Sequence, residues 1–284
     1  MKIFTTIADL RKDIETARKS GASVGLVPTM GALHAGHGSL IQAACDENDY
    51  VVVSNFVNPT QFGPNEDLAA YPRDLEGDCR LAREIGAMAV FAPVIEEMYP
   101  EGTSPVWVEV EGRLSSILCG LSRPGHFRGV TTVVAKLFNI VGPCRAYFGQ
   151  KDGQQAQIIC RMVRDLFMPV EMRILPIIRE ADGLALSSRN AYLSVEERRA
   201  ALVLPRALAG AREMIEQSER NKGRLLKYVK DRVAAEPLAN LDYVEIYTFP
   251  GLEELSDQIS GKIMMAAAVK FGGARLIDNQ VVDC

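Results

Sequence analysis

The feature that most constrains the fold is an alternation of short apolar, β-branched runs with longer segments of helical spacing. The runs, typical of buried strands, lie at residues 24–27, 50–57, 88–92, 145–149 and 170–176. Helical spacing of apolar residues occurs at residues 40–45, 74–86, 129–141 and 154–167. Strands that alternate with helices in this way need right-handed crossovers, so the pattern predicts a parallel, doubly wound α/β sheet of the Rossmann-like class.

The pattern changes after Asn190. Two charged amphipathic helices are expected at residues 196–217 and 221–235, and the first contains Pro205, which should kink or split it. Strand-like runs follow at residues 242–247, 263–269 and 275–277. We therefore expect two domains, a Rossmann-like ligand-binding domain over residues 1–185 and a smaller α+β lid domain over residues 186–284.

Composition favours a soluble globular protein. Hydrophobic residues make up 48% and charged residues 24% of the 284 residues. The 32 Lys and Arg against 36 Asp and Glu give a net charge of -4, which does not favour a nucleic-acid partner. No apolar run reaches the roughly 18 residues of a membrane span, the first ten residues do not resemble a signal peptide, and the six cysteines form no C-x-x-C pair. We expect reduced thiols and a cytoplasmic location with no membrane partner.

Two of the three histidines belong to one phrase, P-T-M-G-A-L-H-A-G-H at residues 28–37. The phrase follows the first predicted strand, and open α/β sheets bind ligands at the carboxyl ends of their strands. Helical backbone after it would place His34 and His37 on one face beside a helix N-terminus, where unpaired N–H groups and two imidazoles can bind phosphate oxygens. We favour a phosphate site, and the third histidine, His126, also falls in a Gly-containing loop.

The histidine pair has two other interpretations. The two side chains could simply cap a helix, or they could bind zinc, although no third ligand lies nearby and H-E-x-x-H is absent. We therefore expect no metal site in the protein. Neither a P-loop nor a G-x-G-x-x-G motif is present, so a nucleotide would have to be held by the histidine phrase.

Further candidates lie after later strands. Lys151 follows the predicted strand at residues 145–149, although a single lysine is usually solvated. Ser187, Ser188 and Arg189 offer hydroxyls and a guanidinium, a common anion-binding set, with a helix cap at Asn190 or Ser194 as the alternative. The polar residues that follow the strand at residues 50–57 are typical of a turn.

The phrase at residues 28–37 resembles the pantothenate synthetase family, also called pantoate–beta-alanine ligases, within the HIGH-motif nucleotidyltransferases. Four further segments extend the likeness, at residues 56–62, 122–129, 148–152 and 182–190, and it continues to the R-L-I-D-N ending at residues 275–279. The resemblance implies ATP-dependent condensation of (R)-pantoate with beta-alanine to pantothenate, AMP and pyrophosphate through a pantoyl adenylate, in coenzyme A biosynthesis. It also implies a homodimer, and Mg²⁺ carried mainly by ATP.

The resemblance also assigns roles to residues. The catalytic set that it implies is His37, His34, Lys151 and Arg189. The ATP-binding set is Pro28, Thr29, Met30, Gly31, His34, His37, Gly149, Gln150, Lys151, Asp152, Ile178, Leu186, Ser187, Ser188 and Arg189. The set for pantoate and beta-alanine is Gln61, Gln155, Asn58 and Arg123.

Two positions depart from the family pattern. Family members usually have Glu where this chain has Gln150, and commonly an aromatic residue where it has Gly153. Losing a carboxylate beside Lys151 could alter its position or its affinity for nucleotide, and we still expect activity. The alternatives are a nucleotidyltransferase that acts on another small substrate, as other H-x-G-H relatives do, and a non-catalytic ATP-binding module.

Overall fold

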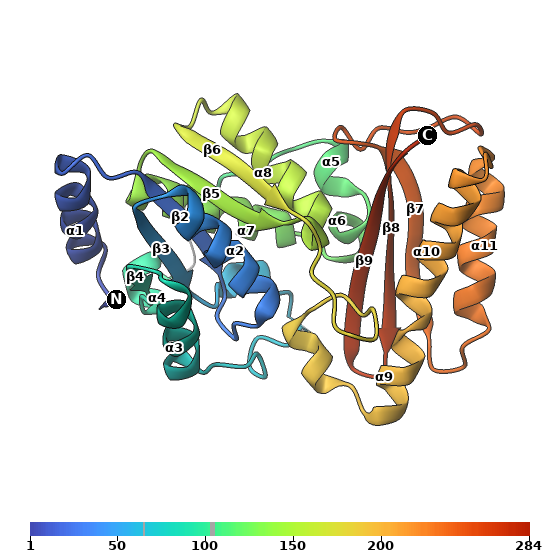
Figure 1. Ribbon diagram of the computed structural model, residues 1–284, viewed down its shortest axis with the longest axis horizontal. Coiled ribbons are helices and arrows are strands. Elements are labelled where there is room, and N and C mark those ends of the chain that lie inside the picture. The colour runs from blue at the N-terminus through green and yellow to red at the C-terminus, as the bar shows by residue number, and fades with distance from the viewer. Residues whose placement is uncertain (65, 103–105) are drawn as a thin grey trace.

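The computed structural model describes residues 1–64, 66–102 and 106–284, and two sheets lie side by side in it (Figure 1). The larger sheet is parallel, with the strand order β1-β4-β3-β2-β5-β6. Its strands are β1 (Lys2–Phe4), β2 (Val24–Thr29), β3 (Tyr50–Asn55), β4 (Ala89–Phe91), β5 (Cys144–Gly149) and β6 (Val170–Leu175). The predicted parallel α/β sheet is confirmed.

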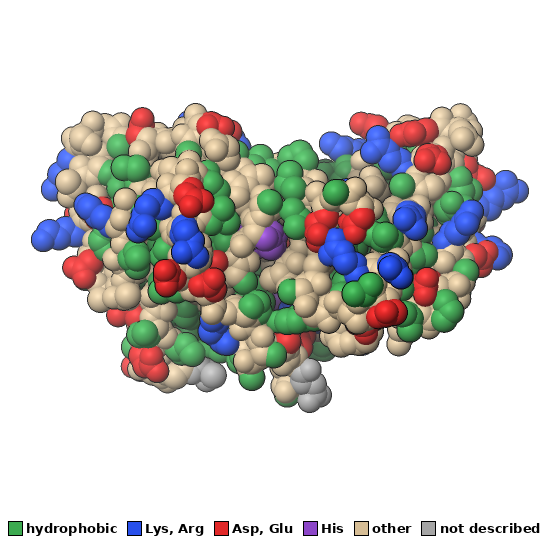
Figure 2. All heavy atoms as spheres, turned by 60° about the horizontal axis from the view of Figure 1, so that its bottom comes forward, with side chains coloured by type: hydrophobic (Ala, Val, Ile, Leu, Met, Phe, Trp, Pro, Cys, Tyr) green, Lys and Arg blue, Asp and Glu red, His purple; other side chains and the backbone are tan. Residues whose placement is uncertain are grey.

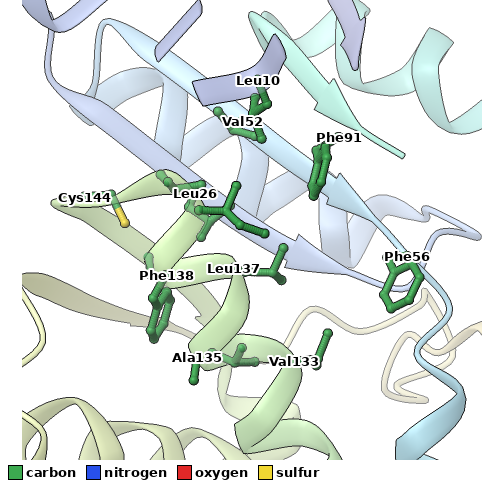
Figure 3. Close-up of a cluster of buried hydrophobic side chains, with 14 of the residues drawn as sticks. Leu10, Leu26, Val52, Phe56, Phe91, Val133, Ala135, Leu137, Phe138 and Cys144 are labelled. Atoms are coloured by element: carbon green, nitrogen blue, oxygen red, sulfur yellow. The ribbon is translucent and has the colours of Figure 1, made fainter. Parts of the chain in front are cut away.

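Helices cover both faces of this sheet because its strands are apolar on both sides. They are α1 (Ile7–Lys19), α2 (Ala35–Glu47), α3 (Leu75–Ile85), α7 (His126–Val141) and α8 (Gly153–Asp165). Leu10 of α1 and Phe138 of α7 pack with Leu26 and Val52 of the strands on one face (Figure 3). Helices α2 and α3 pack on the other face, around Ile41. Burial of these side chains from water stabilises the layered arrangement.

The second sheet is antiparallel, with the order β7-β8-β9. Its strands are β7 (Asn240–Thr248), β8 (Lys262–Phe271) and β9 (Ala274–Asp283), and its helices are α9 (Val195–Ala201), α10 (Val203–Glu216) and α11 (Lys222–Ala234). Helices α10 and α11 lie on the side away from the larger sheet (Figure 1). The smaller α+β unit is therefore confirmed.

Some local expectations were wrong in position. The long helix splits at Leu202 instead of Pro205, which lies in the first turn of α10, where a missing N–H costs nothing. His126 starts α7 and does not lie in a loop, and β1 and α1 were not predicted. Within the described residues, no helix is long and apolar enough to cross a membrane. All six cysteines carry free thiols.

Short helical turns occupy several connections. They are α4 (Ile95–Met98), α5 (Arg113–Ser116), α6 (Cys119–Ser122), η1 (Pro59–Gln61), η2 (Gln150–Asp152) and η3 (Ser188–Tyr192). The strand order reverses between β2 and β5, because the chain leaves β2 toward β3 on one side and reaches β5 on the other. Ligands of open α/β sheets bind at this switch point, and here η2 directly follows β5 and α2 closely follows β2.

Candidate active site

The turn between β2 and α2 is shaped by a buried carboxylate from another helix. The backbone takes positive φ at Gly31 (80°) and Ala32 (51°), and the second of these is unusual for a residue with a Cβ. The Asp78 carboxylate on α3 accepts hydrogen bonds from the backbone N–H groups of Ala32 (3.0 Å) and Leu33 (2.6 Å). Asn55 also donates to it at 2.7 Å. Asp78, only 4% exposed, thus fixes the path of the chain into His34.

His34 and His37 form a reciprocal cap at the start of α2. The Nδ1 atom of His34 accepts from the backbone N–H of Gly36 at 3.1 Å, and Nδ1 of His37 accepts from the backbone N–H of His34 at 3.4 Å. Because Nδ1 is the acceptor in each ring, the proton of a neutral imidazole lies on Nε2. Neither Nε2 atom has a protein partner within the described residues, so both can donate to a ligand. The cap and the phosphate site are therefore compatible.

Burial keeps both rings neutral. It lowers the pKa of His34 to about 4, helped by the charge of Lys151. It lowers the pKa of His37 to about 3, helped by the nearby His34 and Lys151. The ring centroids are 4.2 Å apart, so a proton on one ring would also oppose a proton on the other. At neutral pH the pair offers two N–H donors at a helix N-terminus and adds no charge.

Lys151 reaches the same region from η2, at the carboxyl end of β5. Its Nζ lies 3.8 Å from a carboxylate oxygen of Asp152, and the Lys151 side chain is 21% exposed. The side chain of Gln150 points elsewhere, and its Nε2 donates to Oδ1 of Asn279 on β9 at 3.0 Å. Lys151 is thus the cationic group that the strand end presents, while Gln150 contacts the second sheet.

The segment with Ser187, Ser188 and Arg189 is fastened to a loop of the larger unit. The Arg189 guanidinium binds the Asp67 carboxylate through Nε (3.2 Å) and Nη2 (3.0 Å). The hydroxyls of Ser188 and Tyr71 lie 3.5 Å apart. Ser187 accepts from the backbone N–H of Arg189 at 3.3 Å and caps η3. The helix cap that the sequence offered as an alternative exists at Ser194, which accepts from the backbone N–H of Glu197 at 3.1 Å at the start of α9. Arg189 is held in place by a carboxylate that a ligand would have to displace.

These groups surround one cavity of about 220 Å³. Its lining includes most of the residues that the sequence singled out, namely Pro28, Thr29, Met30, His34, His37, Asn58, Gln61, Gly149, Lys151, Asp152, Gln155, Ile178, Leu186, Ser187, Ser188 and Arg189. A hollow between the two parts of the molecule, with histidine side chains at its base, is visible in Figure 2. The histidine pair, the ammonium and the guanidinium therefore converge at one edge of the sheet.

A second cavity of about 900 Å³ adjoins the first and opens toward the smaller sheet. The two share a set of lining residues, namely Lys151, Asp152, Gln155, Ser187 and Arg189. Ligand pockets usually measure about 300–1,000 Å³, so the first cavity alone is small for a nucleotide. We infer that a nucleotide with a second substrate would extend past the shared wall.

Three of the predicted ligand-binding residues lie outside the smaller cavity. Gly31 is buried in the turn, where a Cβ would come within 2.5 Å of Asn55. Gln150 faces β9, as described above. Arg123 lines only the larger cavity, since Glu66 and His126 hold its guanidinium at 2.5 Å and 2.9 Å.

Asn58 and Gln61 differ in what they can offer. Asn58 is 1% exposed, and its Nδ2 donates to Gln61 Oε1 (3.1 Å) and to the carbonyl of Gly129 (3.1 Å), while its Oδ1 accepts from Tyr99 (2.7 Å). Gln61 Nε2 points at the sulfur of Met30, 3.1 Å away, which is a weak acceptor. A ligand oxygen can replace that contact, whereas Asn58 is fully engaged with protein.

The sequence did not reveal several residues that build this site. Each of three residues contacts a partner more than a hundred positions away in the sequence, namely Asp67, Tyr71 and Asn279. No local pattern marks Asp67 or Tyr71, and the R-L-I-D-N segment that contains Asn279 gave no role for it. The role of Asp78, in contrast, could have been inferred from its place in the helical pattern. It lies three residues after Leu75 and four before Ala82, on the apolar stripe of α3, where a carboxylate needs a buried partner.

Comparison with known proteins gives one consistent family. The family model for pantoate-beta-alanine ligase matches residues 2–281. The chain belongs to this family. It is 57% identical to the pantothenate synthetase of Pelotomaculum thermopropionicum over 282 residues, which cover 99% of each chain.

Solved structures of the family agree with the fold. The pantothenate synthetase of Thermus thermophilus superposes with a TM-score of 0.92 at 49% identity, covering 99% of each chain. The pantoate-beta-alanine ligase of Francisella tularensis, in a complex with beta-gamma ATP and beta-alanine, gives a TM-score of 0.79 at 34% identity and covers 99% of this chain and 97% of that one. The chain is accordingly a ligase of pantothenate synthesis, and the family resemblance seen in the sequence is confirmed.

Proposed function

We propose that the chain condenses (R)-pantoate with beta-alanine in two steps. A pantoate carboxylate oxygen attacks the α-phosphorus of ATP, and the bond to the bridging oxygen breaks to release pyrophosphate. The amine of beta-alanine then attacks the acyl carbon of pantoyl adenylate, AMP leaves as the acyl–oxygen bond breaks, and the amine nitrogen loses its proton. The observation that supports this proposal is the convergence of His34, His37, Lys151 and Arg189 on one cavity.

These four groups match the charge that the first step develops. Negative charge accumulates on the phosphoryl oxygens and on the leaving pyrophosphate, and preorganised donors stabilise it best in a site that excludes water. His34 and His37 supply neutral Nε2–H donors, and Lys151 and Arg189 supply positive charge. The remaining ATP-binding residues named above, except Gly31 and Gln150, line the cavity, and Ile178 and Leu186 would be apolar contacts for the base.

Pantoate would lie between two glutamines. Gln61 has only the Met30 sulfur as partner for its Nε2, and Gln155 on α8 lines the cavity with no side-chain hydrogen bond among the described residues. Asn58 fixes the orientation of Gln61, so we assign it a positioning role. Arg123 is too firmly paired with Glu66 to serve pantoate in this arrangement, and its place on the larger cavity suits a carboxylate that enters from that side.

Mg²⁺ would arrive with the nucleotide. Within the described residues there is no group of three or more His, Cys, Asp or Glu side chains that could hold a metal ion. The phosphate oxygens of ATP supply such ligands themselves, and magnesium usually keeps several waters as well. Asp152 lines both cavities and is the carboxylate available to contact that hydrated ion.

The smaller domain would act as a lid. We propose the division between residues 185 and 186 that the sequence pattern suggests, and Leu184, just before it, is where the chain begins to pack in the core of the smaller unit. Closure over the larger cavity would keep water from the reactive adenylate. The homodimer and the cytoplasmic location that the sequence suggests stay predictions.

The test is a pyrophosphate-release assay in which pantoate and beta-alanine are omitted in turn. We expect release that needs pantoate and ATP, one enzyme-bound adenylate without beta-alanine, and sustained turnover with AMP when beta-alanine is present. A stable nucleotide adduct that beta-alanine does not discharge would instead identify a nucleotidyltransferase. No release in any mixture would leave only an ATP-binding module.

A further inference from the structure

The R-L-I-D-N ending of the chain contains a residue that contacts the backbone of the Lys151 turn. Asn279 lies on β9, in register with Ala266 of β8, and is only 5% exposed. Its Nδ2 donates to the carbonyl of Gln150 at 2.8 Å and to that of Lys151 at 3.0 Å. Its Oδ1 accepts from Nε2 of Gln150 at 3.0 Å. Both donor hydrogens and the acceptor of the amide are therefore used on two consecutive residues.

These bonds set the direction of the Lys151 side chain. The two carbonyls belong to η2, a single 3₁₀ turn at the end of β5, and such short turns have few internal hydrogen bonds to fix them. Holding both carbonyls fixes the peptide planes on either side of the Lys151 Cα and hence the line along which its side chain leaves the backbone. A displacement of about 1 Å at a catalytic group can cost a factor of about 10² in rate.

The two departures from the family pattern lie at this contact. A Cβ at Gly153 would come within 2.6 Å of Gln150 Nε2 and 3.0 Å of the Met264 sulfur. Without a side chain at position 153, the Gln150 amide can fold back and reach Asn279. The Gln150 and Gly153 changes are therefore spatially linked, and together they add one hydrogen bond between the two domains.

The preceding residue of β9 serves the other segment of the site. Asp278, 2% exposed, binds the guanidinium of Arg179 at 2.7 and 2.9 Å, and Arg179 in turn donates to the carbonyl of Gly183 at 3.1 Å. The segment from Arg179 leads directly to Ser187 and Arg189. Neighbouring side chains on β9 thus hold both of the segments that bring positive charge to the cavity.

We propose that Asn279 is a positioning residue for adenylate formation, which acts from the second domain by orienting Lys151. This inference rests on the proposed role of Lys151. The smaller domain is then part of the scaffold of the site.

A double-mutant cycle on the full chain tests the proposal. Asn279→Ala should lower kcat/KM for pyrophosphate release by about tenfold or more, with a rise in KM for ATP. When Lys151 is already Ala, the same change should cost less than about twofold, because residues that act through one another are not additive. Single-turnover adenylate assays keep the slow variants measurable. A purely structural role would lower both backgrounds equally.

Two variants serve as controls. Gln280→Ala changes the next, half-buried residue of β9, which has no side-chain hydrogen bond among the described residues, and should leave activity within about twofold. Gln150→Met removes the donor to Asn279 Oδ1 without adding a charge beside Lys151 and leaves both backbone carbonyls available, so its effect should be smaller than that of Asn279→Ala. Melting temperatures of all variants establish that each is folded.

The possible results distinguish a failure of the positioning role of Asn279 from a failure of the proposed reaction. Equal losses for Asn279→Ala in both backgrounds, or no loss in a folded Asn279→Ala protein, would overturn the positioning role. Near-normal release by Lys151→Ala would overturn the role of Lys151 and this inference with it. If the unaltered chain released no pyrophosphate with pantoate and ATP, the proposed function itself would fail.

Discussion

The two sides of the cavity are held by different kinds of contact. On one side, His34 and His37 cap their own helix, and the buried Asp78 fixes the turn before them. On the other side, Arg189 is paired with Asp67 from a distant loop. The first side is complete before any ligand arrives, whereas the second must exchange a carboxylate for a phosphate. The comparison indicates that the histidine corner, which consists of His34, His37 and the turn before them, has its binding geometry before the ligand arrives. The Arg189 segment, in contrast, changes its contacts when the ligand binds.

The largest effect should come from removing a preset donor. We expect His37→Ala to slow adenylate formation by about 10² to 10³, because the variant loses an Nε2–H aimed at the developing charge. Pyrophosphate release in single turnovers measures it. Gln42→Ala, an exposed residue of the same helix, is the matched control and should react normally. Near-normal rates for His37→Ala would remove this residue from the mechanism.

The next effect tests what makes the corner rigid. Asp78→Asn replaces the oxygen that accepts from Ala32 and Asn55 with an amide group that cannot accept, so two partly buried donors lose their partner. We expect the free energy of unfolding to fall by about 1–3 kcal/mol, measured by urea denaturation. The reaction should slow as well, since the turn that leads to His34 loosens.

Asp74→Ala provides a comparison on the same helix. Asp74 caps α3 by accepting from the backbone N–H of Gly77 at 2.9 Å, and loss of such a cap typically costs about 1 kcal/mol. It does not touch the histidine turn, so activity should stay normal. If Asp74→Ala and Asp78→Asn reduced activity equally, the hydrogen bonds of Asp78 would not be what fixes the turn that leads to His34.

The contrast between the two sides also explains what the sequence could predict. The cap, the turn and both histidines lie within ten residues, and the strand and helix that flank them have clear periodicity, so the corner could be expected from local pattern alone. Lys151 lies beside the histidines because it follows β5, which is the neighbour of β2 in the sheet.

The rest depended on contacts that no local pattern contains. Asp67 and Arg189 are 122 positions apart, and Asn279 and Lys151 are 128 apart. The position of Arg123 depends on distant contacts in the same way, because Glu66 and His126 decide where its guanidinium lies. The helix split at Leu202 was misplaced because Pro205 fits the first turn of a new helix, which the sequence pattern cannot distinguish from a break at the proline itself.

A smaller effect should come from freeing Arg189. If Arg189 exchanges Asp67 for phosphate, Asp67→Asn removes the competitor, and the affinity for ATP should rise. A partly exposed ion pair contributes up to about 1 kcal/mol, so we expect at most about a fivefold lower dissociation constant, measured by calorimetry. Asp182→Asn, which disturbs the pair with Arg198 on the same segment, should leave ATP affinity unchanged.

The opposite result would change the comparison. A weaker affinity for ATP in Asp67→Asn would mean that the carboxylate holds Arg189 in its binding position. Both sides of the cavity would then be fixed in place before ATP binds.

The smallest effect concerns pH, and it follows from the neutral state of the histidines. Burial lowers the pKa of His34 to about 4 and that of His37 to about 3, from an ordinary value of 6.5. Neither ring changes its charge between pH 6.5 and 8, so adenylate formation should show no step from them in that range. Below pH 6.5 these two histidines bind protons in the unfolded chain but stay neutral in the folded chain. The free energy of unfolding should therefore fall as the pH drops toward 3.

A histidine that worked as a cation would behave differently. Its activity would fall as the pH rose through 6.5, because the protonated form would be lost. The rate of pyrophosphate release, measured from pH 6 to 8 at saturating substrates, separates the two cases. A flat profile fits two N–H donors whose Nδ1 atoms are occupied by the cap, since a second proton on either ring would have to break the hydrogen bond that starts α2.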